Sequence, residues 1–144
     1  MILNLRHTGI VVYDLEQSLK FYESNFGFKI FKRMEETGHF ICTILGLENL
    51  KVITVKMTIN DNQMIELLDF TTHKKKLLKR FINDIGPTHI AFTVVDVDKL
   101  YYDFSSKGIK FISKPYTSPD GYAKVAFCLA PEGTYIELVE LLKN

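Results

Sequence analysis

The sequence predicts an α+β protein with two tandem βαβββ modules, residues 5–70 and 87–142, in a single domain that spans residues 1–144. The main observation is an internal repeat, because the stretch 6–15 returns as 88–97, 82 positions further along. Both stretches place a histidine at the start of an apolar run and an aspartate at its end. In each half the spacing of apolar residues also changes from a period of two to one of 3.6 and back, which indicates a strand, a helix and further strands.

A second echo closes each half of the chain. The segments 64–68 (MIELL) and 135–139 (YIELV) are apolar runs with a central glutamate, Glu66 in one and Glu137 in the other. Each half therefore opens with a histidine on one strand and closes with a glutamate on another. Two modules related in this way tend to pair their sheets about a pseudo-twofold axis. We therefore expect a curved mixed sheet around a cleft into which equivalent positions converge.

The first half starts with an apolar, β-branched strand at residues 5–12. Asp14 is a good helix N-cap, and Gln17 three residues later is placed to complete a capping box. The helix then shows a stripe of apolar side chains and ends at Gly27. Its stripe consists of Leu15, Leu19, Tyr22 and Phe26.

Three more strands are expected in this half, at 28–34, 51–58 and 64–69. Acidic and glycine residues at 35–38 indicate a turn, and Asn-Asp-Asn at 60–62 indicates another. The run 40–46 is apolar without clean alternation, so its pattern assigns no element.

The second half repeats the same order after Gly86-Pro87. Asp96 is expected to cap a helix that ends at Gly108. The remaining expected elements are strands at 89–94, 109–112, 123–129 and 135–142, a loop at 115–121 and a turn at 131–133.

Residues 74–81 carry five cations next to three apolar side chains. This composition is typical of a solvated amphipathic helix that links two modules. The alternative is a docking site for an anionic group such as a phosphate or a carboxylate.

Composition narrows the class of protein. The formal net charge is +1, with 18 basic and 17 acidic residues, so no overall field favours nucleic acid or a membrane surface. No run approaches the ~20 apolar residues of a membrane span. Cys42 and Cys128 lie in apolar runs and are expected to be reduced thiols. Residues 1–6 lack the pattern of a signal peptide, and a cytoplasmic protein is the resulting expectation.

The two repeated histidines and two repeated glutamates predict a metal site. A carboxylate on a buried apolar strand is costly unless something compensates its charge, and Glu66 and Glu137 both have apolar neighbours. A divalent cation compensates both, and His7 and His89 complete a set of two nitrogen and two oxygen ligands that suits Zn, Ni, Co, Mn or Fe(II). A single histidine on an apolar strand is commonly a core residue, and a single strand glutamate often faces solvent. Four such residues at equivalent places in two halves are not independent evidence of core packing, so together they favour the metal site.

The remaining histidines have no counterpart in the other half of the chain. His39 and His73 are interpreted as surface or loop residues, with His39 kept as a candidate for the pocket.

These residues resemble the vicinal oxygen chelate superfamily, the fold of glyoxalase I, methylmalonyl-CoA epimerase and extradiol dioxygenases. The resemblance covers nearly the whole chain, with Ala130-Pro131 where the family usually carries Asp-Pro. The matching segments are HTGIVV (7–12), 14–15, 18–22, 27–28, 65–67, 89–92 and 133–138.

The resemblance implies that His7, Glu66, His89 and Glu137 chelate one divalent metal ion. Ring-cleaving dioxygenases and fosfomycin-resistance enzymes of the superfamily typically use two histidines and one glutamate, and bleomycin-binding relatives lack the ligands. Glu66 therefore favours the isomerase branch. By resemblance to glyoxalase I, Glu137 is the catalytic base and Glu66 its counterpart across the metal.

The implied function is a metal-dependent lyase or isomerase of the glyoxalase I (lactoylglutathione lyase) type. The metal acts as a Lewis acid on a small substrate with two neighbouring oxygens and stabilises an enediolate or enolate. The alternatives are an epimerase like methylmalonyl-CoA epimerase, an Fe(II) dioxygenase, a drug-modifying transferase and a non-catalytic drug-binding protein. A homodimer is the expected assembly, and either one chain or two could supply the four ligands.

Overall fold

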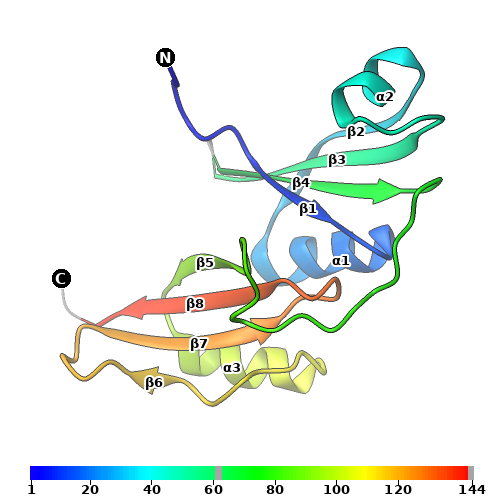
Figure 1. Ribbon diagram of the computed structural model, residues 1–144. Coiled ribbons are helices and arrows are strands. Elements are labelled where there is room, and N and C mark those ends of the chain that lie inside the picture. The colour runs from blue at the N-terminus through cyan, green and yellow to red at the C-terminus, as the bar shows by residue number, and fades with distance from the viewer. Residues whose placement is uncertain (61–62, 143–144) are drawn as a thin grey trace. The chain divides into compact units, whose positions relative to one another are not determined.

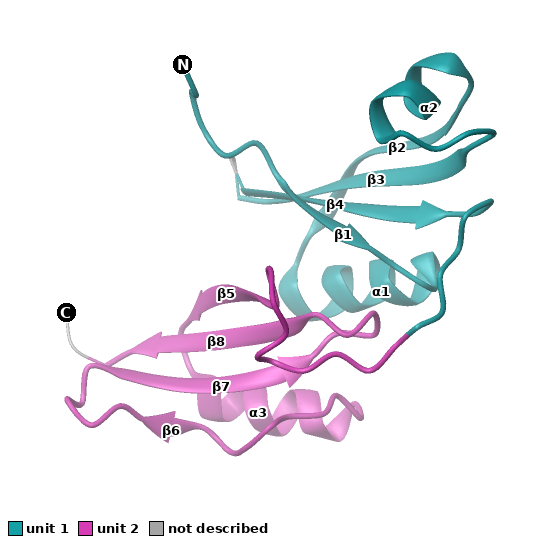
Figure 2. Ribbon diagram, in the orientation of Figure 1, with its two compact units in different colours: residues 1–77 teal, residues 78–144 magenta. Residues whose placement is uncertain are grey.

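The computed structural model describes residues 1–60 and 63–142 (Figure 1). The chain divides into two compact units, unit 1 at residues 1–77 and unit 2 at residues 78–144 (Figure 2). Each unit has its own sheet, so each is described by itself.

Unit 1 is a four-stranded mixed sheet with a helix on each face (Figure 1). Its strand order is β1-β4-β3-β2, in which β1 runs parallel to β4 and the other neighbours are antiparallel. The elements in chain order are β1 (Thr8–Val11), α1 (Leu15–Phe26), β2 (Lys29–Thr37), α2 (His39–Leu45), β3 (Lys51–Ile59) and β4 (Gln63–Phe70).

Unit 2 repeats this topology. Its strand order is β5-β8-β7-β6, with β5 parallel to β8 and the other neighbours antiparallel. The elements are β5 (His89–Val94), α3 (Val97–Ser106), β6 (Tyr116–Thr117), β7 (Ala123–Leu129) and β8 (Tyr135–Leu141). Two mixed sheets with the same strand order confirm the predicted α+β class.

Alternation along the strands separates two faces of the unit 1 sheet. On β4, Ile65 and Leu67 are buried, while Glu66 between them points to the other face. Helix α1 covers the first face with buried Leu19 and Tyr22. Helix α2 packs on the second face, and its cluster consists of Ile41, Leu50 and Val52 with Cys42, Leu47, Leu68 and Phe70 against it.

The predicted helix signals are found at both α1 and α3. Asp14 accepts a hydrogen bond from the Gln17 N–H at 3.0 Å, and Asp96 accepts one from Lys99 N–H at 2.9 Å. Gly27 ends α1 in the left-handed region at φ 75°, where glycine has no steric penalty.

Replacing the α1 cap, Asp14→Ala, is therefore expected to lower the free energy of unfolding by about 1 kcal/mol, because one N–H of the first turn loses its acceptor. Urea denaturation followed by circular dichroism measures this change. Asp14→Ser retains an acceptor and should recover most of the stability. Equal losses in both variants would contradict the capping role.

Three predicted details of secondary structure are wrong, and one stretch without a prediction forms a helix. Residues 35–37 are not a turn, because β2 continues to Thr37 in register with β3. Helix α2, which begins at His39, covers most of the unassigned run 40–46. The expected strand 109–112 is reduced to one bridge between Phe111 and Cys128, and β6 lies inside the expected loop 115–121. Of the turn at 60–62, Asn60 has φ 54° and the other two residues lie outside the described part.

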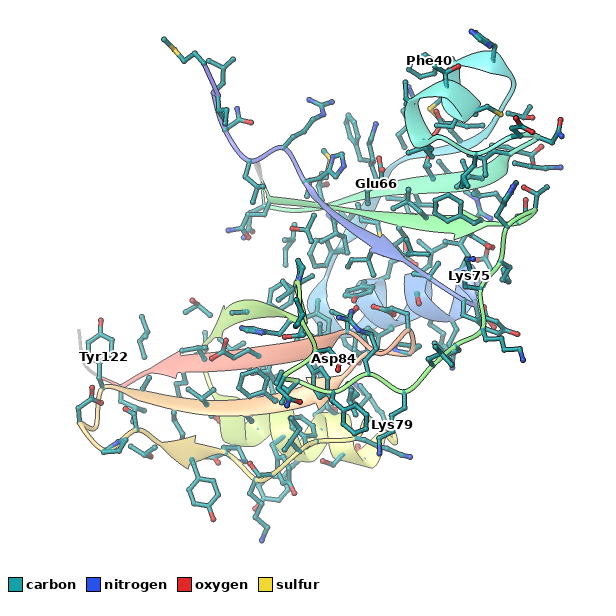
Figure 3. The ribbon with its side chains drawn as sticks, in the orientation of Figure 1. Phe40, Glu66, Lys75, Lys79, Asp84 and Tyr122 are labelled. Atoms are coloured by element: carbon teal, nitrogen blue, oxygen red, sulfur yellow. The ribbon has the colours of Figure 1, made fainter. Side chains whose placement is uncertain are left out.

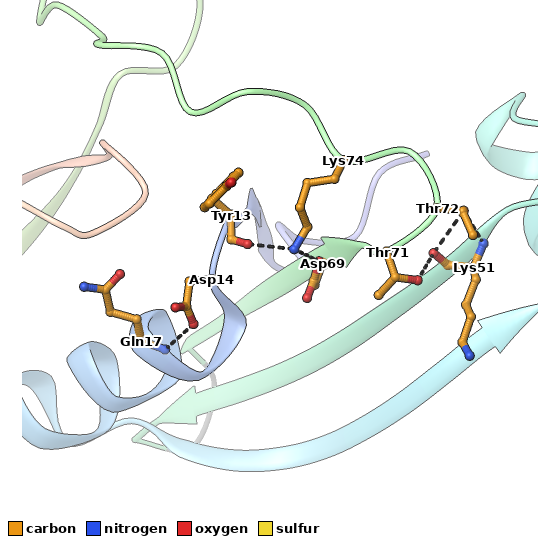
Figure 4. Close-up of polar contacts among 8 residues, drawn as sticks. All are labelled: Tyr13, Asp14, Gln17, Lys51, Asp69, Thr71, Thr72 and Lys74. Atoms are coloured by element: carbon orange, nitrogen blue, oxygen red, sulfur yellow. Dashed lines mark hydrogen bonds and ion pairs between the residues drawn. The ribbon is translucent and has the colours of Figure 1, made fainter.

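The basic segment does not form the predicted linker helix, and residues 74–80 run without regular structure (Figure 3). Its lysines contact different neighbouring groups. The Lys74 ammonium contacts the Asp69 carboxylate at 2.9 Å and donates to the Tyr13 carbonyl at 2.8 Å (Figure 4). Lys79 lies over the Phe81 ring.

Both cysteines are free thiols, as expected. Cys128 is buried on β7, and burial raises the pKa of its thiol to about 12 because the thiolate would lose its hydration. Among residues 1–60 and 63–142, no helix has the length and apolar character that a membrane crossing requires.

Candidate functional site

The first candidate pair lies where β1 meets β4 in unit 1. Gly9 is the register partner of Glu66, so His7, two residues earlier, projects on the same face as that glutamate. The His7 Nε2 atom lies 3.7 Å from Glu66 Oε1, and the two side chains are 26% and 14% exposed. His7 Nδ1 is buried and has no hydrogen-bond partner in the described part of the chain. Figure 3 marks Glu66 on this sheet.

The second candidate pair has the same relationship in unit 2. Ala91 is the register partner of Glu137, and His89 again stands two residues earlier on the parallel strand. His89 Nε2 lies 3.5 Å from Glu137 Oε2, with side chains 44% and 23% exposed. The Thr88 hydroxyl lies 3.3 Å from His89 Nδ1. The repeat in the sequence is therefore a repeat of geometry, since both units place an imidazole beside a carboxylate at the same register.

The two His–Glu pairs differ in the residue on the neighbouring antiparallel strand, β3 in unit 1 and β7 in unit 2. In unit 1, Lys56 on β3 is directly opposite Glu66, and its ammonium lies 3.7 Å from Glu66 Oε2. In unit 2 the equivalent position is Phe127, opposite Glu137, with its ring 5.6 Å from the His89 ring. One carboxylate thus has a cationic neighbour and the other an aromatic one.

The donor atoms fit half of a metal site in each unit. Two ligands of one transition-metal ion, each ~2.1 Å from it, lie roughly 3–4 Å apart. The separations of 3.7 and 3.5 Å are in this range and are longer than direct hydrogen bonds. His7 faces the carboxylate with its Nε2 atom. Among the residues described, no three or more His, Cys, Asp or Glu side chains gather into a set that could hold a metal.

The two unmatched histidines lie apart from these pairs. His39 is exposed at the start of α2, and half-buried His73 has its Nδ1 atom 2.8 Å from the Thr72 hydroxyl. Both are surface residues, and the pocket role kept open for His39 has no contact that supports it.

Sequence reasoning missed Lys56. A signal for it was present, because positions 56 and 66 are equidistant from position 61, in the centre of the predicted turn. A hairpin that turns there pairs the two residues directly.

A separate cavity of about 360 Å³ lies on the α1 face of unit 1, near the start of that helix. Four of its charged side chains pair with one another: Arg33 donates to Glu16 at 2.8 Å, and Lys74 contacts Asp69 (Figure 4 shows the second pair). Asp69 and Glu66 point to opposite faces of β4, so this cavity is not part of the His7–Glu66 site.

Known proteins with similar sequences include glyoxalases. The chain is 32% identical over 143 residues to lactoylglutathione lyase of Schizosaccharomyces pombe. The alignment covers 94% of this chain and 46% of that protein. It is 29% identical to a probable lactoylglutathione lyase of Synechocystis, with 94% of each chain covered. This chain thus spans about half the length of its fission-yeast relative.

A solved structure with the same fold is a glyoxalase family protein from Bacillus cereus. Its TM-score is 0.88, the alignment covers 99% of this chain and 97% of that one, and the identity is 23%, which bears on the fold alone. At the level of sequence, the family model of the Glyoxalase/Bleomycin resistance protein/Dioxygenase superfamily matches residues 4–138. With its two repeated mixed sheets and this match over nearly its whole length, the chain belongs to the Glyoxalase/Bleomycin resistance protein/Dioxygenase superfamily.

Proposed function

We propose that the protein is a metal-dependent lyase or isomerase of the glyoxalase I type, in which His7, Glu66, His89 and Glu137 bind one divalent metal ion. The observation that carries the proposal is the repeated His–Glu pair, at 3.7 Å in unit 1 and 3.5 Å in unit 2, at the same register of a parallel strand pair. The names of the fission-yeast and cyanobacterial relatives support the lyase class.

Each side chain has a defined role in this proposal. His7 and His89 supply neutral imidazole nitrogens, and Glu66 and Glu137 supply carboxylates. The bound metal would supply positive charge that stabilises a developing enediolate or enolate. Glu137 moves the proton between neighbouring carbons of the substrate, and Glu66 is its counterpart. Partial burial of both carboxylates, 14% and 23% exposed, keeps the proton transfer away from bulk water.

The substrate class follows from the same chemistry. A small molecule with two neighbouring oxygens, such as the hemithioacetal of a thiol and a 2-oxoaldehyde, can chelate the metal and present an acidic C–H. A homodimer remains the predicted assembly, and the metal is one of Zn, Ni, Co, Mn or Fe(II).

Elemental analysis of the purified protein, after reconstitution with each of these metals, tests the site. We expect about one ion per chain in the wild type and loss of the ion in the variant Glu66→Ala/Glu137→Ala, because two of the four ligands are removed. Glu48→Ala, an exposed residue of unit 1, is the matched control and should retain the ion.

Activity gives the second readout of the same experiment. Wild type loaded with the preferred metal should isomerise a glutathione hemithioacetal, and chelation should abolish this activity. Failure of every metal to bind would contradict the proposed metalloenzyme. Binding of metal without turnover of hemithioacetals or acyl-CoA esters would reject the lyase assignment and leave the metal site supported.

A further inference from the structure

A row of charged residues crosses the unit 1 sheet on the face that carries His7. Lys32 on β2 is directly opposite Lys56 on β3, and Lys56 is directly opposite Glu66 on β4. Direct partners in an antiparallel sheet share a face, so two ammonium groups and one carboxylate project together. This face is the one opposite helix α1.

The row holds more positive charge than its carboxylate can balance. Like charges directly opposite on neighbouring strands are destabilising, so the Lys32–Lys56 pair lowers the stability of the sheet. The Lys56 side chain is only 27% exposed, and Glu66 is 14% exposed. The nearby Glu36 carboxylate accepts a hydrogen bond from the Thr54 hydroxyl at 2.8 Å, and Glu35 pairs with Lys51 at 3.1 Å.

Residues 78–142, the described part of unit 2, have no equivalent row. Phe127 occupies the position of Lys56, and β6 is only two residues long. Lys124 lies on β7 itself, three residues from Phe127 and therefore on the other face of that strand, where the Asp98 carboxylate engages it. Among the described residues, two lysines therefore accompany Glu66 in the register of its sheet, and none accompanies Glu137.

We propose that Lys56, supported by Lys32, binds an anionic group of the substrate, a carboxylate, beside Glu66. The inference rests on the proposed function, in which Glu66 binds the metal. The negative charge of the Glu66 carboxylate then interacts with that ion as well as with Lys56. The two ammonium groups are left to interact with a negatively charged ligand. A substrate that carries a carboxylate next to its two chelating oxygens satisfies both the metal and Lys56, and a neutral substrate leaves the lysines unpaired.

Lactate and malate test this selectivity, because both chelate through a hydroxyl and a carboxylate and malate has one additional carboxylate. Calorimetric titration of the metal-loaded wild type is expected to show malate binding about tenfold more tightly than lactate, the size of one charge-assisted contact. Lys56→Met should remove most of this preference, and Lys56→Arg should keep it. Lys75→Met, the same change of charge at an exposed residue between β4 and β5, should leave the preference intact.

Two results would overturn the proposal. The first is equal preference for malate in wild type and Lys56→Met. The second is tighter metal binding in Lys56→Met with no change in preference, which would make Lys56 only a counter-ion of Glu66. The metal content of every variant is measured in parallel. If all variants retain the metal, a change in malate preference cannot be attributed to loss of the metal site.

Titration of the metal-free protein keeps the inference independent of the proposed activity. Weak malate binding that Lys56→Met abolishes supports the anion site even if no metal binds and no lyase activity is found. Absence of malate binding in both the metal-free and the metal-treated wild type rejects it.

Discussion

Replacing Glu137 by glutamine is expected to lower turnover of a hemithioacetal by about 10²–10⁴-fold, because the proposed base can no longer accept a proton. Glutamine keeps an oxygen in the place of the carboxylate atom that lies 3.5 Å from His89 Nε2. The metal should therefore remain largely bound, and the loss should fall on kcat rather than on metal content. Steady-state kinetics together with elemental analysis of the same sample measures both quantities.

The equivalent change in unit 1, Glu66→Gln, distinguishes the roles of the two carboxylates. If Glu137 is the base, Glu66→Gln lowers kcat less than Glu137→Gln does. Glu48→Gln, an exposed residue outside the site, is the control and should match the wild type. A larger loss in Glu66→Gln would move the base to unit 1, and wild-type kcat in both variants would remove the carboxylates from the proton transfer.

Leu67→Ala is expected to destabilise the protein by about 2–5 kcal/mol, the largest effect on stability predicted for this chain. Leu67 follows Glu66 on β4, is 0% exposed and packs on the α1 side of the sheet. Truncation removes buried apolar surface and leaves a cavity that the pairing of β1, β4 and β3 prevents from collapsing. Denaturant titration followed by circular dichroism measures the change as a shift of the midpoint with little change of slope.

The matched control for this prediction is Leu77→Ala. Leu77 is 52% exposed in the segment between β4 and β5, so the same chemical change should cost less than about 0.5 kcal/mol. Equal midpoints for Leu67→Ala and wild type would contradict the burial of Leu67 beneath α1.

Local signals explain why the sequence predicted most helices and strands. Asp14 and Asp96 lie next to the N–H groups that they cap, and Gly27 takes the left-handed conformation that ends α1. These interactions span at most a few residues, so a pattern of neighbours contains them. The alternation along β4 and β8 places Glu66 and Glu137 on the face opposite the buried leucines beside them, and this alternation is also present in the sequence.

Helix α2 shows where local pattern fails. Its seven residues, HFICTIL, contain β-branched and aromatic side chains that favour strands, and its N-cap position is Gly38, which offers no side-chain acceptor. Burial of Ile41 against Leu50 and Val52 stabilises the helix instead. The end of β2 follows the same principle, because pairing of residues 35–37 with β3 outweighs their turn composition.

The sequence by itself determined the duplication, the order of helices and strands along each module in outline and the identity of the four candidate ligands, because each of these is carried by composition, spacing or short-range periodicity. Only the tertiary structure decided which residues flank the ligands. The parallel register of β1 with β4 and of β5 with β8 places each histidine within 3.7 Å of its glutamate. The β3–β4 register adds Lys56 to one pair, while the β7–β8 register adds Phe127 to the other. The positions of residues 56 and 66 about the predicted turn indicate the β3–β4 register. The parallel registers of β1 with β4 and of β5 with β8 join segments far apart in the chain, and no local pattern of residues specifies them.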